Sequence, residues 1–305
     1  MRSWSLRHRV KEQGRRLAAR IDRYLYPQVF SGGLAAEDAG IWIAGAIREK
    51  QPVVVGRLGS VEARLLGEAR FRSGRFSRVT CREAHRNAGI FPVDQSTLHQ
   101  AAARIGAALA VVDLLALWDS PYQAKLAAQR EPLARSCSLT ALEPWWQVQP
   151  WSAALEGKRV LVVHPFARTI RAQWHRREAL FPGRGVLPDF DLQVLQPPLT
   201  LAGGTQGYVS WIAALEDLIA RSKACSFDVA LLGCGAYGLP LAAAIQGMGR
   251  PAIQMGGALQ LLFGIRGRRW EAMPPFAALM NNAWVRPSPD ETPSSASQVD
   301  GGCYW

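Results

Sequence analysis

Long apolar runs are absent from this 305-residue chain, and no stretch of about 18 consecutive apolar residues occurs. The sequence therefore predicts no transmembrane helix, and the basic N-terminus lacks the apolar core of a signal peptide. Cysteines are few: there are five, an odd number, and no CxxC pair occurs. These absences argue against a disulfide framework and a zinc site, and they favour a cytoplasmic protein.

Familiar catalytic signatures are missing too: there is no serine nucleophile elbow, no HExxH zinc motif and no P-loop lysine. Acidic residues are scarce relative to basic ones, since 36 Lys and Arg against 24 Asp and Glu give a net charge of +12. A positive field of this kind attracts nucleic acid, anionic lipid headgroups or phosphorylated small molecules. The 49% hydrophobic content is ordinary for a globular protein, so the chain needs neither disulfides nor metal to fold.

Much of the positive charge lies in a segment of its own, residues 1–32. Apolar residues recur there at near-helical spacing between arginines, which predicts a basic amphipathic helix. Three interpretations follow: the apolar stripe packs on the main domain, residues 1–26 contact an anionic membrane surface at the inner face, or the helix binds nucleic acid. Nucleic acid is the least favoured partner, because no recognition motif accompanies the charge.

The body of the chain, residues 33–286, alternates helix-like and strand-like segments. We expect helices at 33–50, 61–69, 96–110, 122–131, 167–179, 207–222 and 239–248. We expect strands at 53–55, 110–118, 160–166, 192–195, 228–232 and 251–255. This order predicts an α/β fold with a mostly parallel, doubly wound, Rossmann-like sheet and helices on both faces. Ligands of such folds bind at the carboxyl ends of the strands.

Three segments carry weaker patterns. Residues 82–89 are dense in polar groups and are predicted to form a loop, and 137–155, rich in Trp and Pro, are expected to mix helix and loop. The tail, residues 287–305, is rich in Pro and Ser and is expected to be irregular. Its last five residues are apolar enough to dock on the domain.

A G-x-G-x-x-G pattern, Gly233 to Gly238, follows one expected strand and precedes a helix. Such glycines let a backbone turn approach a phosphate at a helix N-terminus. A dinucleotide site needs an acidic residue about 20 positions later, and none ends the next strand. The pattern therefore favours a nucleotide or sugar-phosphate contact, with ligand-free helix–strand packing and NAD binding as alternatives.

A second turn, Arg57 to Glu62, also joins a strand to a helix, with Ser60 as the expected N-cap. Arg57 is suited to neutralise a phosphate, and Glu62 to bind metal or act as a base. Glu62 has an equally simple structural interpretation, as a carboxylate that complements the helix dipole.

The histidines indicate a functional site less clearly than the two turns do. His85 lies in the polar loop beside Asn87, and His164 follows an expected strand, whereas Asp113 lies within one. A lone histidine is more often structural than catalytic.

The order of these pieces, over residues 40–265, resembles the GT-D type glycosyltransferases. That family carries an Arg-Phe-Gly-Asp-Gly-Glu motif after a strand, where this chain has Arg-Leu-Gly-Ser-Val-Glu at 57–62. The segments 157–166, 196–200, 231–236 and 252–257 are similar to the family's later strands and turns. The chain also resembles a set of bacterial proteins found with surface-polysaccharide genes, at 86–89, 233–240, 256–264 and 301–305.

The resemblance implies a nucleotide-sugar-dependent glycosyltransferase in surface-polysaccharide or glycan assembly, with a nucleotide-sugar donor and a glycan or lipid-linked acceptor. In the family the Asp-x-Glu pair binds Mn²⁺ or Mg²⁺, and Glu62 would be the remaining metal ligand. Ser60 replaces the Asp, and a hydroxyl is a poorer ligand for a hard cation. Basic residues are therefore expected to neutralise the diphosphate. The alternatives are a non-catalytic nucleotide- or sugar-binding protein and a nicotinamide-dependent enzyme.

Motif positions and resemblance together give an expected site. Its catalytic residues are Ser60 and Glu62. Its expected substrate-binding residues are Arg57, Gly59, His85, Asn87, His164, Pro198, Thr200, Gly233, Gly235, Tyr237, Gly238, Gly256, Gly257 and Gln260.

Overall fold

The computed structural model describes residues 17, 21, 23–118, 120–130 and 132–305. Most of the predicted basic helix therefore lies outside the described residues. Its described members Leu17, Ile21 and Leu25 are helical, with exposed fractions of 60%, 49% and 55%. Within the described part of the chain, every helix falls short of the length and apolar content that a bilayer crossing requires.

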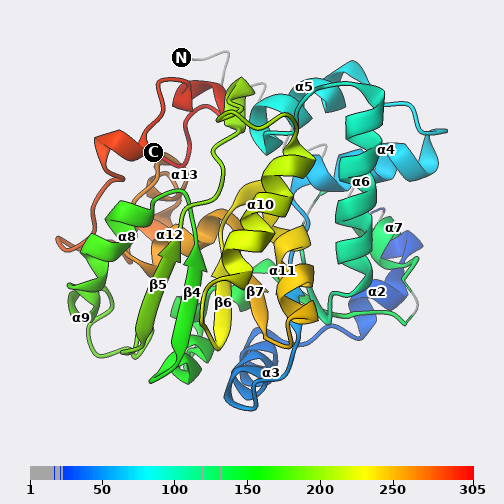
Figure 1. Cartoon of the computed structure of the whole chain (residues 1–305). Coiled ribbons are helices and arrows are strands. Elements are labelled where there is room, and N and C mark those ends of the chain that lie inside the picture. Colours follow the sequence, from blue (N-terminus) through cyan, green and yellow to red (C-terminus); the bar gives the residue numbers. More distant parts are fainter. Residues whose placement is uncertain (1–16, 18–20, 22, 119, 131) are drawn as a thin grey trace.

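Seven parallel strands form one sheet in the order β3-β2-β1-β7-β6-β4-β5 (Figure 1). β7 is the middle strand of the seven. On one side of it, β1 pairs with β7, β2 with β1, and β3 with β2 at the sheet edge. This confirms the predicted α/β fold with a doubly wound parallel sheet. The strands are β1 (Val54–Gly56), β2 (Leu114–Leu117), β3 (Arg135–Ser138), β4 (Arg159–Val163), β5 (Asp191–Leu195), β6 (Val229–Leu232) and β7 (Ala252–Gln254).

Alternate strand residues face opposite layers, so each strand serves two cores. Val54 and Leu161 belong to one core, and Val55 and Val160 to the other. The first core lies under α4 (Ser60–Phe71), α5 (Arg78–Ala88), α6 (Gln95–Ala110), α7 (Gln123–Ala127), α10 (Trp211–Lys223) and α11 (Gly238–Gly247).

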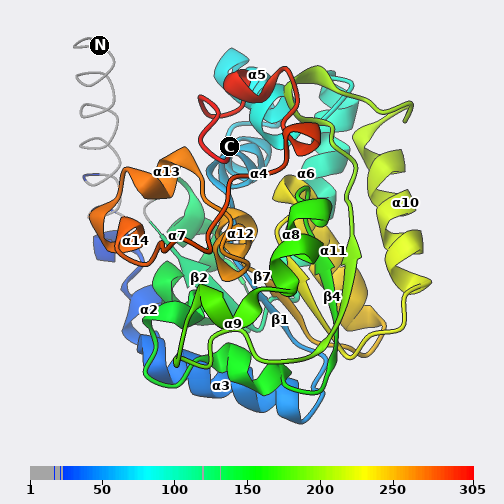
Figure 2. The same cartoon turned by 90° about the vertical axis from the view of Figure 1, so that its left-hand side faces the viewer.

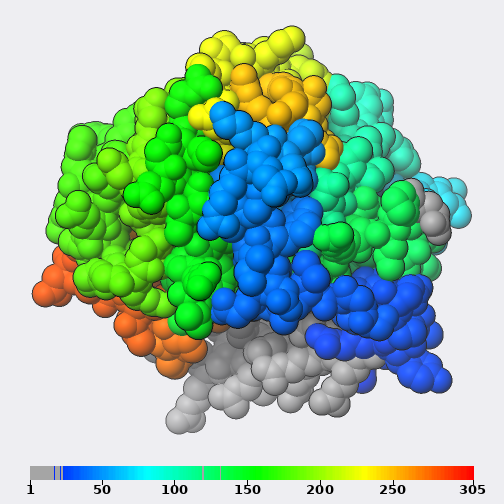
Figure 3. Space-filling view, turned by 90° about the horizontal axis from the view of Figure 1, so that it is seen from below, coloured from blue at the N-terminus to red at the C-terminus, as the bar shows by residue number. Residues whose placement is uncertain are grey.

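The second core lies under α3 (Ala36–Arg48), three 3₁₀ turns and the helices α8, α9 and α12. Figure 3 shows α3, in blue, running across the lower end of the molecule. The turns are η1 (Leu139–Leu142), η2 (Pro144–Trp146) and η3 (Trp151–Leu155), and the helices are α8 (Ala167–Trp174), α9 (Arg177–Leu180) and α12 (Leu259–Leu262). The remaining short elements are α2 (Pro27–Ser31), η4 (Leu201–Gly203), η5 (Gly235–Tyr237), η6 (Gly256–Ala258), α13 (Arg268–Glu271), α14 (Pro274–Ala277), η7 (Pro289–Glu291) and η8 (Ala296–Gln298).

The loop predicted at 82–89 is wrong, because these residues form most of α5. Ser77 caps the helix by accepting a hydrogen bond from the Thr80 N–H (3.1 Å), and Gly89 ends it in the left-handed region at φ 66°. Only small residues, including Ala84 and Ala88, are buried on its inner face. Because these buried residues are small, the sequence shows no clear apolar periodicity that would predict the helix.

Some observed boundaries of helices and strands differ from the predicted ones. The strand predicted at 110–118 begins only at Leu114, because α6 runs through Ala110. Asp113 precedes the strand and accepts a hydrogen bond from the Val54 N–H (2.7 Å). The helix predicted at 167–179 divides into α8 and α9, and β3 was not predicted at all.

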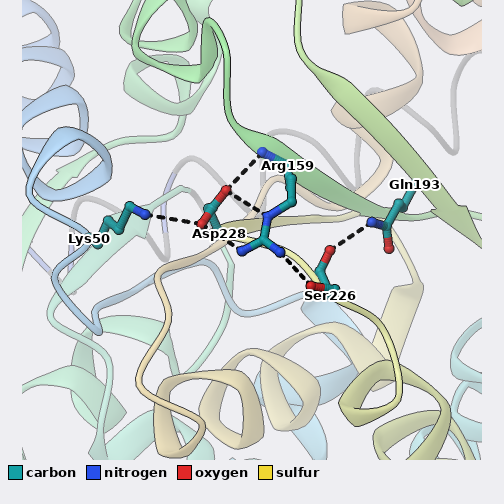
Figure 4. A network of polar contacts seen from close by, with 5 residues as sticks. All are labelled: Lys50, Arg159, Gln193, Ser226 and Asp228. Carbon is teal, nitrogen blue, oxygen red and sulfur yellow. Dashed lines mark hydrogen bonds and ion pairs between the residues drawn. The ribbon is translucent and has the colours of Figure 1, made fainter.

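A polar network joins the amino-terminal edges of β4, β5 and β6 (Figure 4). The Asp228 carboxylate accepts from Lys50 Nζ (3.2 Å) and from the backbone N–H (3.0 Å), Nε (3.2 Å) and Nη2 (3.1 Å) of Arg159. Gln193 donates to the Ser226 carbonyl (2.7 Å). The hydrogen bonds from Arg159 hold the pKa of Asp228 well below its ordinary value, although burial opposes them.

The C-terminal segment, residues 287–305, has only η7 and η8 as regular structure and docks on the domain, as its apolar end suggested. The Glu291 carboxylate accepts from the backbone N–H groups of Arg168 (2.7 Å) and Thr169 (3.2 Å) at the start of α8. Trp305 donates from its indole to the Glu291 carbonyl (2.9 Å). Figures 1 and 2 both show this segment, in red, beside α5.

Candidate functional site

Functional groups gather where the central strands end. Arg57 follows β1, Trp118 follows β2, Glu143 comes shortly after β3, and Gly256 follows β7. Parallel strands place these positions along a single edge of the sheet, the usual ligand-binding edge of this architecture.

Arg57 is the central cation of this edge. Its backbone N–H donates to Gln254 Oε1 (2.8 Å), and its guanidinium carbon lies 5.2 Å from the ring centre of Trp118. Among the described residues its side chain makes no hydrogen bond or close ion pair, and Nε is buried without a partner. Burial is the main cause that lowers its pKa, and the charge of Glu62 is the largest effect that raises it. Among the described residues, the guanidinium charge is therefore poorly compensated.

Two consecutive glycines lie beneath this group. A Cβ on Gly256 would lie 2.9 Å from Arg57 Nη1, and a Cβ on Gly257 would lie 2.5 Å from Cε1 of Tyr304. Gly256 also has φ 64°, a conformation that side-chain-bearing residues rarely adopt. The sequence assigned both glycines to the site, and the structure places them there as a floor without side chains.

Beside Gly256 and Gly257, a wall of the site is formed by Arg269 of α13 and by Asp300 and Tyr304 of the C-terminal segment. Arg269 lies over the Tyr304 ring (4.9 Å to its centre), and its Nη1 lies 3.4 Å from the phenol oxygen. Arg269 also pairs with Asp300 (3.4 Å). Burial raises the pKa of Tyr304, against the effect of Arg269. No sequence motif marked Arg269 or Asp300, and Tyr304 was marked only as part of the 301–305 resemblance.

Glu62 lies in the first turn of α4. The expectation that Ser60 caps this helix is wrong. The N-cap is Gly59, with extended dihedrals (φ −68°, ψ 160°), whereas Ser60 is the first residue of the helix. The Glu62 carboxylate folds back onto Gly59, where a Cβ would clash with it. Burial raises the pKa of Glu62, and its backbone hydrogen bond and Arg57 partly offset this. Glycine at the cap leaves the space that the carboxylate occupies.

Glu143 is a residue that the sequence did not indicate. Its side chain is 5% exposed and accepts a hydrogen bond from Trp146 Nε1 (2.7 Å). Burial raises the pKa of Glu143 to about 7, although Trp146 and Arg57 oppose the shift. An isolated glutamate in a Trp- and Pro-rich segment gives no pattern that identifies it.

The described residues of this edge do not form a site for a resident Mn²⁺ or Mg²⁺. Glu62 is held against Gly59 and lies near the positive charge of Arg57, which repels a cation. Over the described ranges, no group of three or more His, Cys, Asp or Glu side chains is placed to hold a metal ion.

The glycines of the 233–238 turn divide into two kinds. A Cβ on Gly233 would meet His164 Cδ2 at 2.6 Å, and one on Gly238 would meet Gln254 Cγ at 2.9 Å. These two serve close packing. Gly235 is exposed, has φ 59° and has open space where a Cβ would lie. It alone leaves this turn open to a ligand.

His164 is part of the core. It is 3% exposed, and its Nδ1 accepts a hydrogen bond from the Phe166 N–H (3.0 Å). Burial lowers its pKa to about 3, so the ring stays neutral at physiological pH. This environment favours a structural role over the expected substrate contact.

The other expected residues form a second group along α5 and the segment 197–206. The Thr200 hydroxyl bonds the Tyr237 hydroxyl (2.8 Å), and Pro198 is buried nearby in sequence. A Cβ on Gly203 would lie 3.1 Å from His85 Nε2. These contacts show the group as packed structure that follows β5 and β6.

Asn87 and Gln260 hold the C-terminal segment. Asn87 Oδ1 accepts from the Asp300 N–H (3.3 Å). Gln260 is wholly buried, and its Nε2 lies within hydrogen-bond distance of the Tyr304 carbonyl (3.1 Å) and the carbonyls of Ile265 and Arg266 (both 3.2 Å). Both residues therefore position the segment that forms the wall.

A cavity of about 250 Å³ adjoins Trp118 at the ends of β2 and β3. Ser120 is 6% exposed, and its hydroxyl has no partner within the part of the chain described. The described lining residues are Arg23, Phe30, Gly33, Leu34, Leu117, Trp118, Ser120, Gln123, Ala124, Ser136, Cys137 and Ser138. The edge thus combines a partly buried cation, two carboxylates of raised pKa and an adjoining cavity.

Comparisons with family models, curated proteins and solved structures found no match to this chain. A function is therefore argued from the chemistry of this edge.

Proposed function

We propose that this protein is a nucleotide-sugar-dependent glycosyltransferase of the GT-D-like type, acting in the assembly of surface polysaccharide or another glycan. One observation carries the proposal: the partly buried Arg57 guanidinium lacks a side-chain partner among the described residues at the ligand-binding edge. Cleavage of a nucleotide sugar leaves a nucleoside diphosphate, whose charge grows in the transition state. A positioned guanidinium stabilises that charge most strongly in a site shielded from water.

Carboxylates near Arg57 supply the other half of the chemistry. The acceptor hydroxyl oxygen attacks the anomeric carbon, the bond to the diphosphate oxygen breaks, and the hydroxyl proton passes to a carboxylate. Glu143, with a pKa of about 7, is suited to take this proton near neutral pH, and Glu62 is the second candidate. The diphosphate leaves with the bonding electrons and is held by Arg57.

The donor's nucleoside is assigned to the cavity beside Trp118. This cavity shares the Trp118 side chain with the Arg57 contact, so a ligand spanning both reaches the guanidinium with its phosphates. The unpartnered Ser120 hydroxyl offers a hydrogen bond to a base or ribose.

The acceptor is proposed to be a glycan or a lipid-linked sugar, and the protein to act in the cytoplasm at the inner face of the membrane. The described apolar side chains Leu17, Ile21 and Leu25 lie four residues apart and are about half exposed, so the domain does not cover them. With the surrounding arginines of the sequence, this stripe suits an anionic lipid surface.

A thermal-shift screen tests the proposal first. UDP-, GDP-, CMP- and dTDP-sugars, NAD and NADP are each added to the full chain, with and without Mn²⁺. A ligand at 100 times its Kd stabilises by about 2.7 kcal/mol, which raises Tm by about 4 °C at this chain length. We expect one nucleotide sugar to stabilise the protein, Arg57→Gln to abolish the shift, and the exposed control Arg48→Gln to retain it.

A transfer assay with the stabilising donor then separates catalysis from binding. Glu143→Gln is expected to lower the rate at least about 100-fold while the thermal shift persists. Stabilisation by NAD alone, or by no compound, overturns the proposal. Donor binding without transfer to any glycan or lipid-linked acceptor supports the non-catalytic binding protein instead.

A further inference from the structure

We infer that Arg57, Tyr304 and Arg269 form a clamp for a diphosphate group, and that the C-terminal segment completes this site. The inference rests on the proposed function and names the contacts that hold the donor's phosphates. Two of its members, Arg269 and Tyr304, lie more than 200 positions after Arg57, and neither was among the expected site residues.

The three side chains lie in a row on the glycine floor. Arg57 lies against Gly256 and the Tyr304 ring against Gly257, so two consecutive glycines hold these two side chains. Arg269 follows, stacked on the Tyr304 ring at 4.9 Å with Nη1 3.4 Å from the hydroxyl. The row therefore offers two guanidinium groups and one hydroxyl, all of which donate hydrogen bonds to phosphate oxygens.

The charges of the row point to an anionic ligand. Burial is the main cause that lowers the pKa of Arg57; Glu62 opposes it, and Arg269 adds a smaller effect in the same direction as burial. Asp300 balances Arg269 only at 3.4 Å, with both side chains about 40% exposed. Bringing two cations together is unfavourable unless an anion joins them, and a diphosphate carries enough charge to neutralise both.

The wall is fixed before any ligand arrives. The buried Gln260 amide holds the Tyr304 carbonyl, and the Trp305 indole bonds the Glu291 carbonyl. Glu291 is itself 6% exposed and caps α8. Anchors on both sides keep the Tyr304 hydroxyl in place, so binding needs little ordering of the segment.

Titration calorimetry of the full chain with inorganic pyrophosphate and with UDP tests the clamp. We expect Arg269→Gln to weaken both affinities about 10- to 100-fold and Tyr304→Phe about 3- to 10-fold, since each change removes donors to a charged group. The neighbouring Arg268→Gln, exposed on the same helix, is the matched control and should stay within about twofold. Phenylalanine keeps the packing on Gly257, and unchanged Tm values verify folding.

The outcomes separate the clamp from the transferase. Wild-type affinities in both clamp variants overturn the clamp, whether or not transfer activity is found. Selective loss in these variants supports the clamp, and if no donor sugar is then transferred, only the transferase proposal fails. Absence of pyrophosphate and UDP binding to the wild-type chain overturns both.

Discussion

Replacing Asp228 by alanine removes the centre of the polar network at the amino-terminal edge of the sheet. The carboxylate is 15% exposed, but its partners Arg159 and Lys50 are 46% and 60% exposed. Solvent screening therefore reduces each ion pair to at most about 1 kcal/mol. The bond to the Arg159 backbone N–H adds about 1 kcal/mol, so the variant should lose about 1–3 kcal/mol of unfolding free energy.

For a chain of 305 residues the unfolding entropy is about 0.6 kcal/mol per kelvin, so Tm should fall by about 2–5 °C. Calorimetry or circular dichroism at pH 7 measures this. Asp191→Ala is the matched control, because Asp191 begins the adjacent strand and is exposed. It should shift Tm by less than about 1 °C.

The pH dependence gives a second check. The pKa of Asp228 is depressed in the folded chain, so its stabilisation is present above about pH 4 and is lost as the pH falls below that value. The difference in Tm between wild type and Asp228→Ala should therefore shrink from pH 7 to pH 3. An equal difference at both pH values, or a control shift as large as that of the variant, would refute the reasoning.

Three further changes follow from the site. Gly256→Ala should cost about 1–2 kcal/mol for its left-handed φ and, because its Cβ displaces Arg57, weaken pyrophosphate binding more than tenfold by calorimetry; wild-type affinity would contradict the floor. Glu291→Gln should lower the unfolding free energy by about 1–3 kcal/mol in denaturant titrations, and its exposed neighbour Asp290→Asn by less than about 0.5. Glu143→Gln should stabilise by about 1–2 kcal/mol above about pH 7, where the buried carboxylate ionises, and by almost nothing near pH 4; a pH-independent effect would exclude the raised pKa.

The sequence was most informative where apolar residues ran continuously into a glycine turn. The strands around Val54, Val160 and Val229 were all predicted near their observed positions, because strands buried on both faces leave an unbroken apolar run. By contrast, β3 contains arginine, two serines and a single cysteine at the sheet edge, so no apolar run marked it.

The candidate site was only half predictable. Arg57, Gly256 and Gly257 could be proposed because each follows a strand, and parallel strands bring such positions to one edge. Arg269 and Tyr304 reach that edge through turns and a docked segment, which carry no periodic pattern. Their neighbours are set by tertiary contacts between residues far apart in the chain, which local sequence patterns do not encode.

The pairing of β1 with β7 has a consequence for how the chain folds. Val54 is bonded beside Ala252, so the central strand gains its second neighbour only after about 200 further residues have been made. During synthesis β1 can pair only with β2, and its other edge stays unprotected until β7 emerges. We therefore expect folding of this protein to be slow and dependent on late closure of the sheet, and the ligand site to appear last, once Tyr304 has docked.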